Sequence, residues 1–447
     1  MPMTLGALTT FEAWTASTLN AVVKNWYADK IYDQLNREVF MLAHFEKAVV
    51  DWNGKMCHVP VKVGRNTGVG WRAESGGLPA ATNQVYADLQ IPAKYVYGRF
   101  QVTGQSIAAA NRGGENSFIS ALGDEMDGLI DDVRNELDQN CFSGGRCVGF
   151  LNQHQVGAGA APDVWDFTGD TAKVQALLTA KGANLNATYV RMDTYAIIGA
   201  AEVALDIAAV TATGTISLQA ALDTSGVAAG YAIAVIISDN AATLTDLGPN
   251  TTQFNSNQMT GIFGNLTEPT IWSVDRTDAT ATNAALKSTI LTMADSLTHE
   301  RTGLTPTRMQ VCFDEVETLG GGKIDMLVLA PALRSEYAAL MNQTASLNTV
   351  TDKAKKGDVG FDGFAFNGLP LNAARHCPKG LVLYMESKTW RIYELSKAEF
   401  EDRDGSILSR VSGQDAHEGF YKWYCQLVCH HPNRNGILVG IDFPGAA

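Results

Sequence analysis

The sequence contains no run of about 18 or more apolar residues, the length that a membrane-spanning helix needs, although 46% of its 447 residues are apolar. Its first residues, MPMTLGALTTFEAW, include neither the basic stretch nor the compact apolar core of a signal peptide. We therefore expect neither membrane insertion nor secretion. The composition is otherwise typical of a globular protein, and the length allows two or three domains with a large buried core.

Positive charge is also scarce, because 34 Lys and Arg stand against 47 Asp and Glu, for a formal net charge of −13. The densest basic run is short, Asp352-Lys353-Ala354-Lys355-Lys356, and has the character of an exposed loop. Proteins that hold nucleic acid tightly need clustered cations, since counterion release drives that binding. Tight phosphate binding is therefore disfavoured, whereas loose contact with packed nucleic acid remains compatible with this charge.

Cysteine does not form the dense framework of a small secreted domain, since seven residues are scattered over the whole chain. The odd count predicts reduced thiols and an intracellular site of assembly. Cys141 and Cys147 bracket Ser-Gly-Gly, so a disulfide between them is geometrically possible, but free thiols are favoured. The seven are Cys57, Cys141, Cys147, Cys312, Cys377, Cys425 and Cys429.

Motifs that carry chemistry are missing as well. The run Gly320 to Lys323 lacks the spacing of a phosphate-binding loop, and His299-Glu300 is not followed by the second His of a zinc protease. Carboxylates adjacent on a helix, such as Asp131 and Asp132, point in different directions and cannot act as an acid/base pair. We therefore predict no enzyme activity, no catalytic, cofactor-binding or metal-ligating residues, and no cofactor.

The sequence Cys425-x-x-x-Cys429-His430-His431 contains the ligand types that zinc prefers. It lies in YKWYCQLVCHH, which has the pattern of a strand. A spacing of four places both cysteines on one face, roughly 13 Å apart, too far to share one ion. Core packing is the favoured interpretation, and a metal site the alternative.

Residues 11 to 47 have helical periodicity with an apolar, aromatic stripe. Little chain surrounds this stripe, so it either packs on a neighbouring subunit or on the core of its own domain. Both readings fit the segment equally well. The stripe comprises Trp14, Leu19, Val22, Val23, Trp26, Lys30 and Ile31.

From residue 53 to 103 the period changes to two, which predicts a long β-hairpin. Its first strand places Cys57, Val59, Val61 and Val63 on one face. Its second strand covers 91 to 102, and about twenty weakly apolar, Gly-rich residues, 64 to 84, form an extended tip. Such a long loop is usually functional or ordered by a partner.

Residues 117 to 142 predict a helix about 39 Å long, with Ser117 as its N-cap. Seven acidic residues and one Arg occupy the surface away from its apolar face, which we interpret as a solvated face, or else as a contact for a basic loop of a neighbour. The apolar face comprises Phe118, Leu122, Met126, Leu129, Ile130, Val133, Leu137 and Cys141.

Residues 152 to 258 are rich in Ala, Thr, Gly and Val, and their short apolar runs predict a small β-domain. Thr171 to Lys181 fits helix or strand. From residue 284 the pattern alternates between helix and strand: a helix marked by Leu286, Ile290, Met293 and Leu297, a strand at 324 to 329, and a helix that Pro331 begins. Further strands are expected at 381 to 385, 390 to 395, 420 to 430 and 436 to 441.

In order and character these segments resemble the major capsid protein of tailed bacteriophages, which has the Hong Kong 97-like fold. The resemblance covers nearly the whole chain but rests on pattern, without an invariant catalytic motif. It lies in the acidic helix followed by CFSGGRCVGFLN, in MTGIFGN, in IDMLVLAPALRSEYAAL, in FNGLPLNAARHCPKGLVLYMESKTWRIYEL and in FYKWYCQLVCHHPNRNGILVGI.

The resemblance implies an α+β fold with six parts. These are an N-terminal arm, 1–52; an E-loop hairpin, 53–104; a P-domain with a spine helix, 105–151; an inserted β-rich domain, 152–258, exposed and replaceable by a linker; an A-domain, 259–397; and C-terminal P-domain strands, 398–447. The insertion exceeds what the core fold needs. The arm is too short for the scaffolding extension that some members carry.

The function implied is that of a structural protein of the virion, assembled in the host cytoplasm into hexamers and pentamers of an icosahedral head around double-stranded DNA. Implied partners are other copies of the chain, a separate scaffolding protein (or one removed beforehand), a portal at one vertex, a cement protein, and packaged DNA through weak contacts. The alternatives are an encapsulin-type cargo shell and, from another class, an α+β enzyme without an identifiable site.

Overall fold

The structure is a computed structural model that describes residues 39–48, 52, 54–105, 115–156, 163–182, 184–198, 206–211, 214–219, 222, 230–237, 258–277, 286–293, 302–343, 364–402 and 408–442. The chain divides into two compact units, 1–37 and 38–447, and the described residues all belong to the second. The predicted helix of 11 to 47, with Trp14 and Trp26, therefore lies almost entirely outside the described residues. Its described end forms the short helix α2 (Met41–His44) and the strand β1 (Glu46–Lys47).

The predicted hairpin is present, but its second strand differs from the prediction. Strand β2 (Met56–Gly64) pairs antiparallel with β3 (Val85–Pro92), from Met56 opposite Pro92 to Gly64 opposite Val85. The apolar face of β2 is confirmed, since Cys57, Val61 and Val63 are buried and Val59 is half-buried. The predicted second strand, 91 to 102, is divided at Ala93, and β4 (Lys94–Thr103) joins a different sheet.

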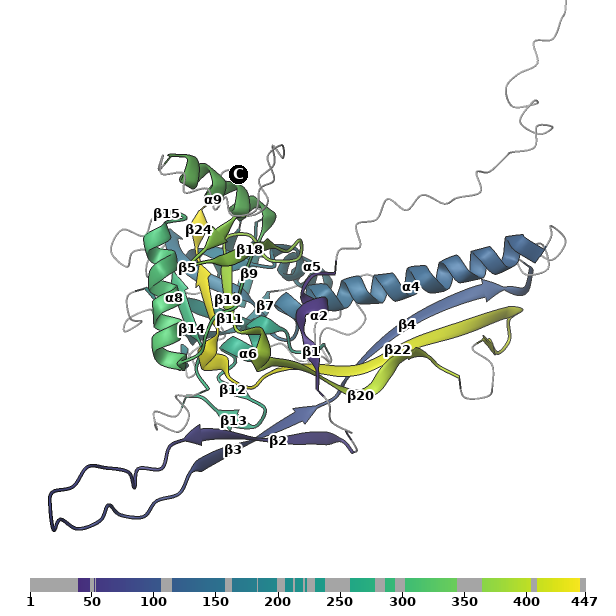
Figure 1. Cartoon of the computed structure of the whole chain (residues 1–447). Coiled ribbons are helices and arrows are strands. Elements are labelled where there is room, and N and C mark those ends of the chain that lie inside the picture. Colours follow the sequence, from purple (N-terminus) through teal and green to yellow (C-terminus); the bar gives the residue numbers. More distant parts are fainter. Residues whose placement is uncertain are drawn as a thin grey trace, which may run out of the picture. The chain divides into compact units, whose positions relative to one another are not determined.

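That sheet contains the longest of the described strands. Strand β22 (Ala416–Cys429) pairs with β4 along one edge, and with β20 (Trp390–Phe400) and β21 (Ser409–Arg410) along the other. The short β1 adds in parallel to β20. Figure 1 shows this sheet running alongside the long helix α4 (Glu115–Ser143). Gly98 permits the close approach, because a Cβ there would lie 3.0 Å from side-chain atoms of Leu129 and Val133.

Helix α4 confirms the strongest sequence signal, with two differences. It begins at Glu115, so Ser117 lies inside the helix and is not its N-cap. Val133, Leu137 and Cys141 are buried as predicted. The acidic surface is not solvated throughout, however, since Asp138 is buried and accepts a hydrogen bond from the backbone N–H of Leu42 at 3.0 Å.

The strands after α4 form a closed ring. Strand β11 (Ile233–Ile237) pairs with both β5 (Cys147–Val156) and β7 (Leu185–Arg191), so the order β11-β5-β6-β10-β9-β7 returns to β11. The other members are β6 (Asp163–Gly169), β9 (Asp206–Val210) and β10 (Thr215–Leu218), and β8 (Ile197–Ile198) pairs with β7 outside the ring. The segment Thr171–Lys181, whose sequence fits helix or strand, forms the helix α5. Asp170 caps this helix, because its side chain accepts a hydrogen bond from the backbone N–H of Lys173 at 3.0 Å.

The ring does not coincide with the predicted inserted domain, 152–258, because β5 begins at Cys147. Its strands also share a core with the rest of the chain, as Phe150 and Ile236 lie in the same apolar cluster as Leu137 and Phe263. Rings of Phe150 and Phe263 are 5.3 Å apart, centroid to centroid. The predicted division into domains stays a prediction, but these contacts argue against free replacement of 152–258.

A second, six-stranded sheet has the order β14-β23-β19-β16-β18-β17. Helices α8 (Pro306–Gly320) and α9 (Pro331–Gln343) contribute apolar side chains to the cluster on one of its faces. Pro331 begins α9 as predicted, whereas α8 was not predicted. The strands are β14 (Thr289–Thr292), β23 (Gly436–Val439), β19 (Val382–Met385), β16 (Met326–Leu329), β18 (Leu369–Ala373) and β17 (Ala365–Phe366).

Two predictions fail in this region. The helix expected at Leu286, Ile290, Met293 and Leu297 is wrong, because Thr289–Thr292 is strand β14, buried at every position and paired in parallel with β23. The C-terminal strands also do not all return to one sheet. Strand β22 lies in the long sheet, and β23 lies in the six-stranded sheet.

The remaining elements are short. They are helix α6 (Ile262–Thr267), the pair β12 (Thr270–Ile271) and β13 (Val274–Asp275), the pair β15 (Thr302–Gly303) and β24 (Ile441–Asp442), and the turns η1 (Ser387–Thr389) and η2 (Pro432–Arg434).

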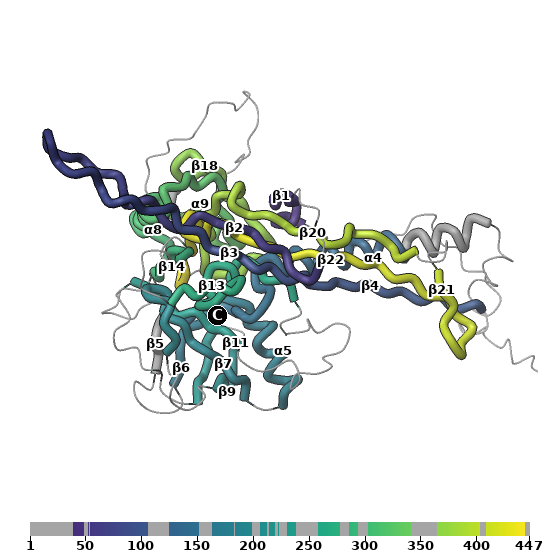
Figure 2. Tube along the Cα trace, turned by 90° about the horizontal axis from the view of Figure 1, so that it is seen from below, coloured from purple at the N-terminus to yellow at the C-terminus, as the bar shows by residue number. Residues whose placement is uncertain are grey.

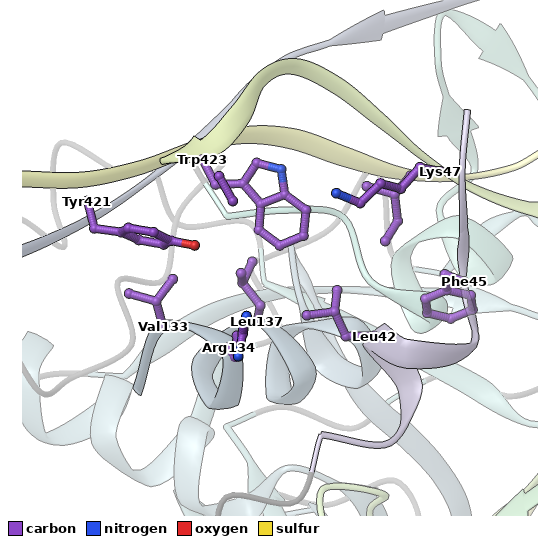
Figure 3. Close-up of a pocket in the computed structure, with 10 residues that line it drawn as sticks. Leu42, Phe45, Lys47, Val133, Arg134, Leu137, Tyr421 and Trp423 are labelled. Atoms are coloured by element: carbon purple, nitrogen blue, oxygen red, sulfur yellow. The ribbon is translucent and has the colours of Figure 1, made fainter. Parts of the chain in front are cut away.

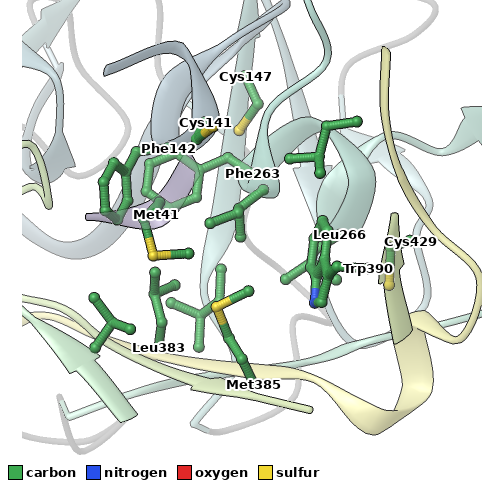
Figure 4. Close-up of a cluster of buried hydrophobic side chains, with 14 of the residues drawn as sticks. Met41, Cys141, Phe142, Cys147, Phe263, Leu266, Leu383, Met385, Trp390 and Cys429 are labelled. Atoms are coloured by element: carbon green, nitrogen blue, oxygen red, sulfur yellow. The ribbon is translucent and has the colours of Figure 1, made fainter. Parts of the chain in front are cut away.

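The largest apolar cluster lies where these parts meet (Figure 4). Met41 of α2, Phe142 of α4, Phe263 of α6 and Trp390 of β20 are all buried there. The Trp390 indole donates to Oδ1 of the buried Asn435 at 2.9 Å, which satisfies its polar group. The described part of the second unit thus has its own packed core.

Candidate interaction surfaces

The tip of the β2–β3 hairpin exposes large apolar side chains. Val69, Trp71 and Leu78 retain 85%, 102% and 92% of their maximal accessible surface, and no other described residue among the large exposed apolar side chains exceeds 64%. Among the described residues, nothing of the chain's own core covers Trp71. Exposed apolar side chains gathered on one loop are typical of an interaction site.

The tip nonetheless has local order at its base. Asn66 Nδ2 donates to the carbonyl of Thr82 at 2.5 Å, and the N–H of Gly68 donates to Asn66 Oδ1 at 2.6 Å. The Thr67 and Thr82 hydroxyls are 3.1 Å apart. Further out, the N–H of Gly76 donates to Ala73 O at 2.9 Å, which closes a turn. These polar contacts shape the loop and leave the apolar side chains uncovered.

A second exposed aromatic group lies on the long sheet. Tyr95 and Tyr97 of β4 are 53% and 60% exposed and flank Tyr424 of β22. The Tyr95 and Tyr424 rings meet edge to face at 4.9 Å, and the Tyr97 hydroxyl donates to that of Tyr424 at 3.0 Å. This hydrogen bond, together with partial burial, raises the pKa of Tyr97. We call Tyr95, Tyr97 and Tyr424 the tyrosine patch.

A groove of about 200 Å³ lies between α4 and the long sheet (Figure 3). Its walls are mainly apolar, and its two cations are Lys47 and Arg134. Lys47 Nζ is 2.6 Å from Glu394 Oε1 and lies 5.3 Å from the centre of the Trp423 ring. No nucleophile with an adjacent base lines this groove. The lining residues are Leu42, Phe45, Lys47, Val133, Arg134, Leu137, Ile392, Ala398, Tyr421 and Trp423.

The cysteine and histidine cluster of β22 is a packing feature. Cys425 and Cys429 are buried free thiols, and burial raises the pKa of each to about 12, so both stay protonated. Burial also lowers the pKa of His430 to about 4, and its Nε2 lies 2.8 Å from the Tyr393 hydroxyl. In the part of the chain that the structure describes, no three His, Cys, Asp or Glu side chains are placed to hold one metal ion.

Cys141 and Cys147 are also free and buried, so the less favoured disulfide is not formed. The described helices include none that is both long and apolar enough to cross a membrane. Asp131 of α4 lies 3.5 Å from Arg134, one turn on, which is a surface ion pair.

A buried lysine of α5, which the sequence did not single out, joins this helix to the end of α4. Lys173 Nζ donates to the carbonyl of Ser143 at 2.6 Å and to Gln258 Oε1 at 3.2 Å. Burial lowers its pKa to about 8, although Asp170 and Glu136 favour the charged form. In the sequence, Lys173 follows Asp170 by three residues, a spacing that is common on exposed helices. Only the fold therefore shows that Lys173 is buried.

The base of the hairpin forms an apolar cluster, which we call the hairpin joint. It unites β2 and β3 (Cys57, Val61, Leu89, Ile91) with the long sheet (Tyr393, Val428). Trp52, Ala93 and the β12–β13 pair, through Ile271 and Trp272, complete it.

Comparison with protein-family models gives no match, and no curated protein matches this sequence. Solved structures do match. A chain of the cyanophage A-1(L) capsid asymmetric unit aligns with a TM-score of 0.55 and 12% identity, over 94% of this chain and 98% of that chain. The capsid of a native GTA particle aligns with a TM-score of 0.49 and 10% identity, over 97% and 100%. The SrpI encapsulin of Synechococcus elongatus PCC 7942 aligns with a TM-score of 0.43 and 8% identity, over 96% of each.

The first of these similarities, at nearly full length, shows the fold. The chain has the α+β, Hong Kong 97-like fold of phage capsid proteins.

Proposed function

We propose that this chain is the major capsid protein of a tailed-phage head. Its copies form the hexamers and pentamers of an icosahedral shell that encloses double-stranded DNA. The observation that carries the proposal is the correspondence of fold with the cyanophage capsid chain, over 94% of this chain and 98% of the other. The protein is accordingly a structural component of the virion and not an enzyme.

The hairpin tip supports this proposal independently of the fold. Trp71 and Leu78 are almost completely exposed, although their subunit already has a packed core. Apolar side chains gain free energy on leaving water, so a tip of this kind favours contact with another chain. The tyrosine patch offers a second such surface, since tyrosine buries apolar area and retains a hydroxyl for hydrogen bonding.

The charge of the chain fits a shell that encloses DNA without binding it tightly. With a net charge of −13, the protein cannot neutralise many phosphates, so contacts with packaged DNA are weak and non-specific. Its further partners would be a separate scaffolding protein, a portal at one vertex and a cement protein. In this proposal, residues 1–52 form an arm, 53–104 the E-loop, 105–151 and 398–447 most of the P-domain, and 259–397 the A-domain, whose sheet β23 of the C-terminal segment joins. The ring at 147–237, near the predicted insertion, would be exposed on the outer surface.

Electron microscopy of the purified protein, expressed with a candidate scaffolding protein, tests the proposal. We expect capsomers or closed icosahedral particles. A protein that remains monomeric with every candidate scaffold, at concentrations far above the micromolar range, would contradict it. Particles that hold a protein cargo in place of DNA would instead support an encapsulin-type shell.

Limited proteolysis compares the same surfaces before and after assembly. In free subunits, we expect the first cuts within residues 1 to 50 and 64 to 90. In particles, both regions should be protected. A useful control variant replaces residues 66–82 by a short Gly-Ser turn, which should leave a soluble subunit that forms no particles. Equal resistance of free and assembled wild-type protein would count against contacts through these segments.

A further inference from the structure

The turn between β12 and β13 has an unusual backbone. Its two residues, Trp272 and Ser273, have φ values of 50° and 66°. Two-residue turns of this kind normally use Asn or Gly, because a Cβ is unfavourable in the left-handed region. A tryptophan there is an outlier, and such strain persists where the surrounding structure holds it in place.

What holds this turn is the β2–β3 hairpin. The N–H of Gln90 in β3 donates to the carbonyl of Trp272 at 3.0 Å, and the Ser273 hydroxyl donates to Gln90 Oε1 at 3.2 Å. Figures 1 and 2 both show β13 beside β3. The strained turn therefore contacts the hairpin through both of its residues.

The Trp272 side chain lies in the hairpin joint. It is buried among residues of the hairpin and of the long sheet, including Leu89, Ile91 and Val428. The left-handed backbone of the turn thus places the indole in the joint while the Trp272 carbonyl meets the N–H of Gln90. One short turn contacts the hairpin by packing and by hydrogen bonds.

The backbone near the joint gives the hairpin few other attachments. Ala93 is the only residue between the end of β3 and the start of β4. On the outer edge of β3, Pro92 lies two residues from Gln90 and lacks an N–H group. The Gln90 bond is therefore a main attachment of β3 outside its pairing with β2.

We propose that the β12–β13 turn is a clamp that fixes the direction in which the hairpin leaves the long sheet, with Trp272 and Ser273 as positioning residues. This inference rests on the proposed function, in which the tip must reach a neighbouring copy. An extended chain advances about 3.3 Å per residue, so Glu74, which precedes Gln90 by sixteen residues and lies toward the tip, can lie about 50 Å from Gln90. A rotation of about 10° at the joint would then move the tip by about 9 Å.

Distance measurements on free subunits test the clamp. All seven cysteines are buried, so spin labels attach selectively to new exposed cysteines at E74C on the tip and E317C on α8. Pulsed electron–electron double resonance of this labelled protein gives the wild-type distance distribution, whose width includes the local motion of the loop. Trp272→Ala should widen it at least twofold, and amide exchange at Gln90 should accelerate at least tenfold.

Gln90→Pro provides a second variant in case Trp272→Ala does not fold. Proline lacks the N–H that donates to Trp272 and the side chain that accepts from Ser273, and Pro60 and Pro92 already occupy equivalent ladder positions. It should also widen the distribution. Asn367→Ala is the matched control: Asn367, with φ 50°, lies in the two-residue turn between β17 and β18, and should leave the distribution unchanged.

An unchanged distance distribution in Gln90→Pro, or in a folded Trp272→Ala, would overturn the clamp. Widening of the same size in Asn367→Ala would overturn it too, because the effect would not be specific to this turn. Since these measurements use unassembled protein, a wild type that never forms particles would refute the proposed function and leave the result on the clamp standing.

Discussion

Truncation of the hairpin tip should weaken assembly without changing the stability of the subunit. Trp71 is 102% exposed and Leu78 is 92% exposed, so neither contributes packing within its own chain. Burial of a tryptophan removes roughly 150–250 Å² from water, worth about 4–6 kcal/mol at roughly 25 cal/mol per Å². Part of this is offset by ordering of the loop, and truncation of interface tryptophans commonly costs about 2 kcal/mol or more.

We therefore expect Trp71→Ala to cost about 2–4 kcal/mol per subunit contact, which weakens each contact roughly 30- to 700-fold at 1.4 kcal/mol per factor of ten. Leu78→Ala should cost about 1–2 kcal/mol, since less area is removed. Light scattering over a series of protein concentrations measures the threshold for assembly. Thermal unfolding of free subunits, in the same buffer, measures the stability of the fold.

Leu319→Ala is the matched control for Leu78→Ala. Leu319 lies on α8 and is 59% exposed, so its truncation removes the same atoms from a surface outside the hairpin. It should leave the assembly threshold within about twofold. The reasoning is refuted if Trp71→Ala assembles at the wild-type threshold, or if it lowers the Tm of free subunits by more than about 4 °C, which would show that Trp71 already packs within the subunit.

Three further results are expected. Burial holds the pKa of Lys173 at about 8, below its usual 10.5, so the charged Lys173 lowers the free energy of unfolding below pH 8, and this cost disappears as the pH rises to 10.5. In urea unfolding, the wild type should therefore gain up to roughly 3 kcal/mol over that interval relative to Lys173→Met. If the free energies of unfolding of the two proteins change in parallel with pH, the lowered pKa of Lys173 is disproved. Mature particles boiled with detergent and reductant should run as one band near 48 kDa, because no Lys lies between Gly64 and Ala93 to form isopeptide bonds at the tip, and a ladder of multimers would disprove this. Replacement of 152–258 by a Gly-Ser linker should give insoluble protein, since the apolar cluster that contains Phe263 would lose Val190, Ala234 and Ile236. The same replacement of 403–407 should be tolerated, and a soluble, folded product of the first would show that the ring is separable.

The hairpin shows what the sequence can and cannot predict. Period-two alternation located β2 and the exposed tip, because alternation follows directly from the geometry of a strand. It did not show that the run from Ile91 to Val102 changes partner at Ala93. Alternation is the same on either side of such a change, since it records which side chains are buried and not which strand lies alongside.

The error at 286–297 has a related cause. Leu286, Ile290, Met293 and Leu297 fit a helix by spacing, yet Thr289–Thr292 forms a strand buried at all four positions. A strand buried on both faces has no polar face, so its short apolar run is indistinguishable from a helical one. Pairing with β23, almost 150 residues away, decides the outcome. The ring is similar: a small β-domain with short strands was expected in 152–258, but closure depends on β11 pairing with β7 as well as β5.

The sequence predicted the exposed tip of the hairpin, but it did not predict the contacts of the β12–β13 turn or of Lys173. A loop of about twenty residues without a surrounding core indicates an exposed segment, and Trp71 on this loop is exposed. The clamp had no such signal, because Trp-Ser is not a sequence typical of a tight turn. Only the fold brings Trp272 to Gln90, and only the fold buries Lys173.

In this chain, different apolar residues supply the free energy of folding and the free energy of association, whereas in many oligomers the same residues supply both. Subunits of obligate oligomers often have no stable folded monomer, because one apolar surface supplies both folding and association. Here the described core is formed within the chain, by residues such as Phe142 and Trp390. Among the described residues, the most exposed large apolar side chains are Val69, Trp71 and Leu78 on the tip. Changes in the core should therefore lower the stability of the free subunit, and changes at the tip should raise the concentration needed for assembly. A shell protein benefits from this arrangement, because its subunits can fold and remain soluble before the contacts between them form.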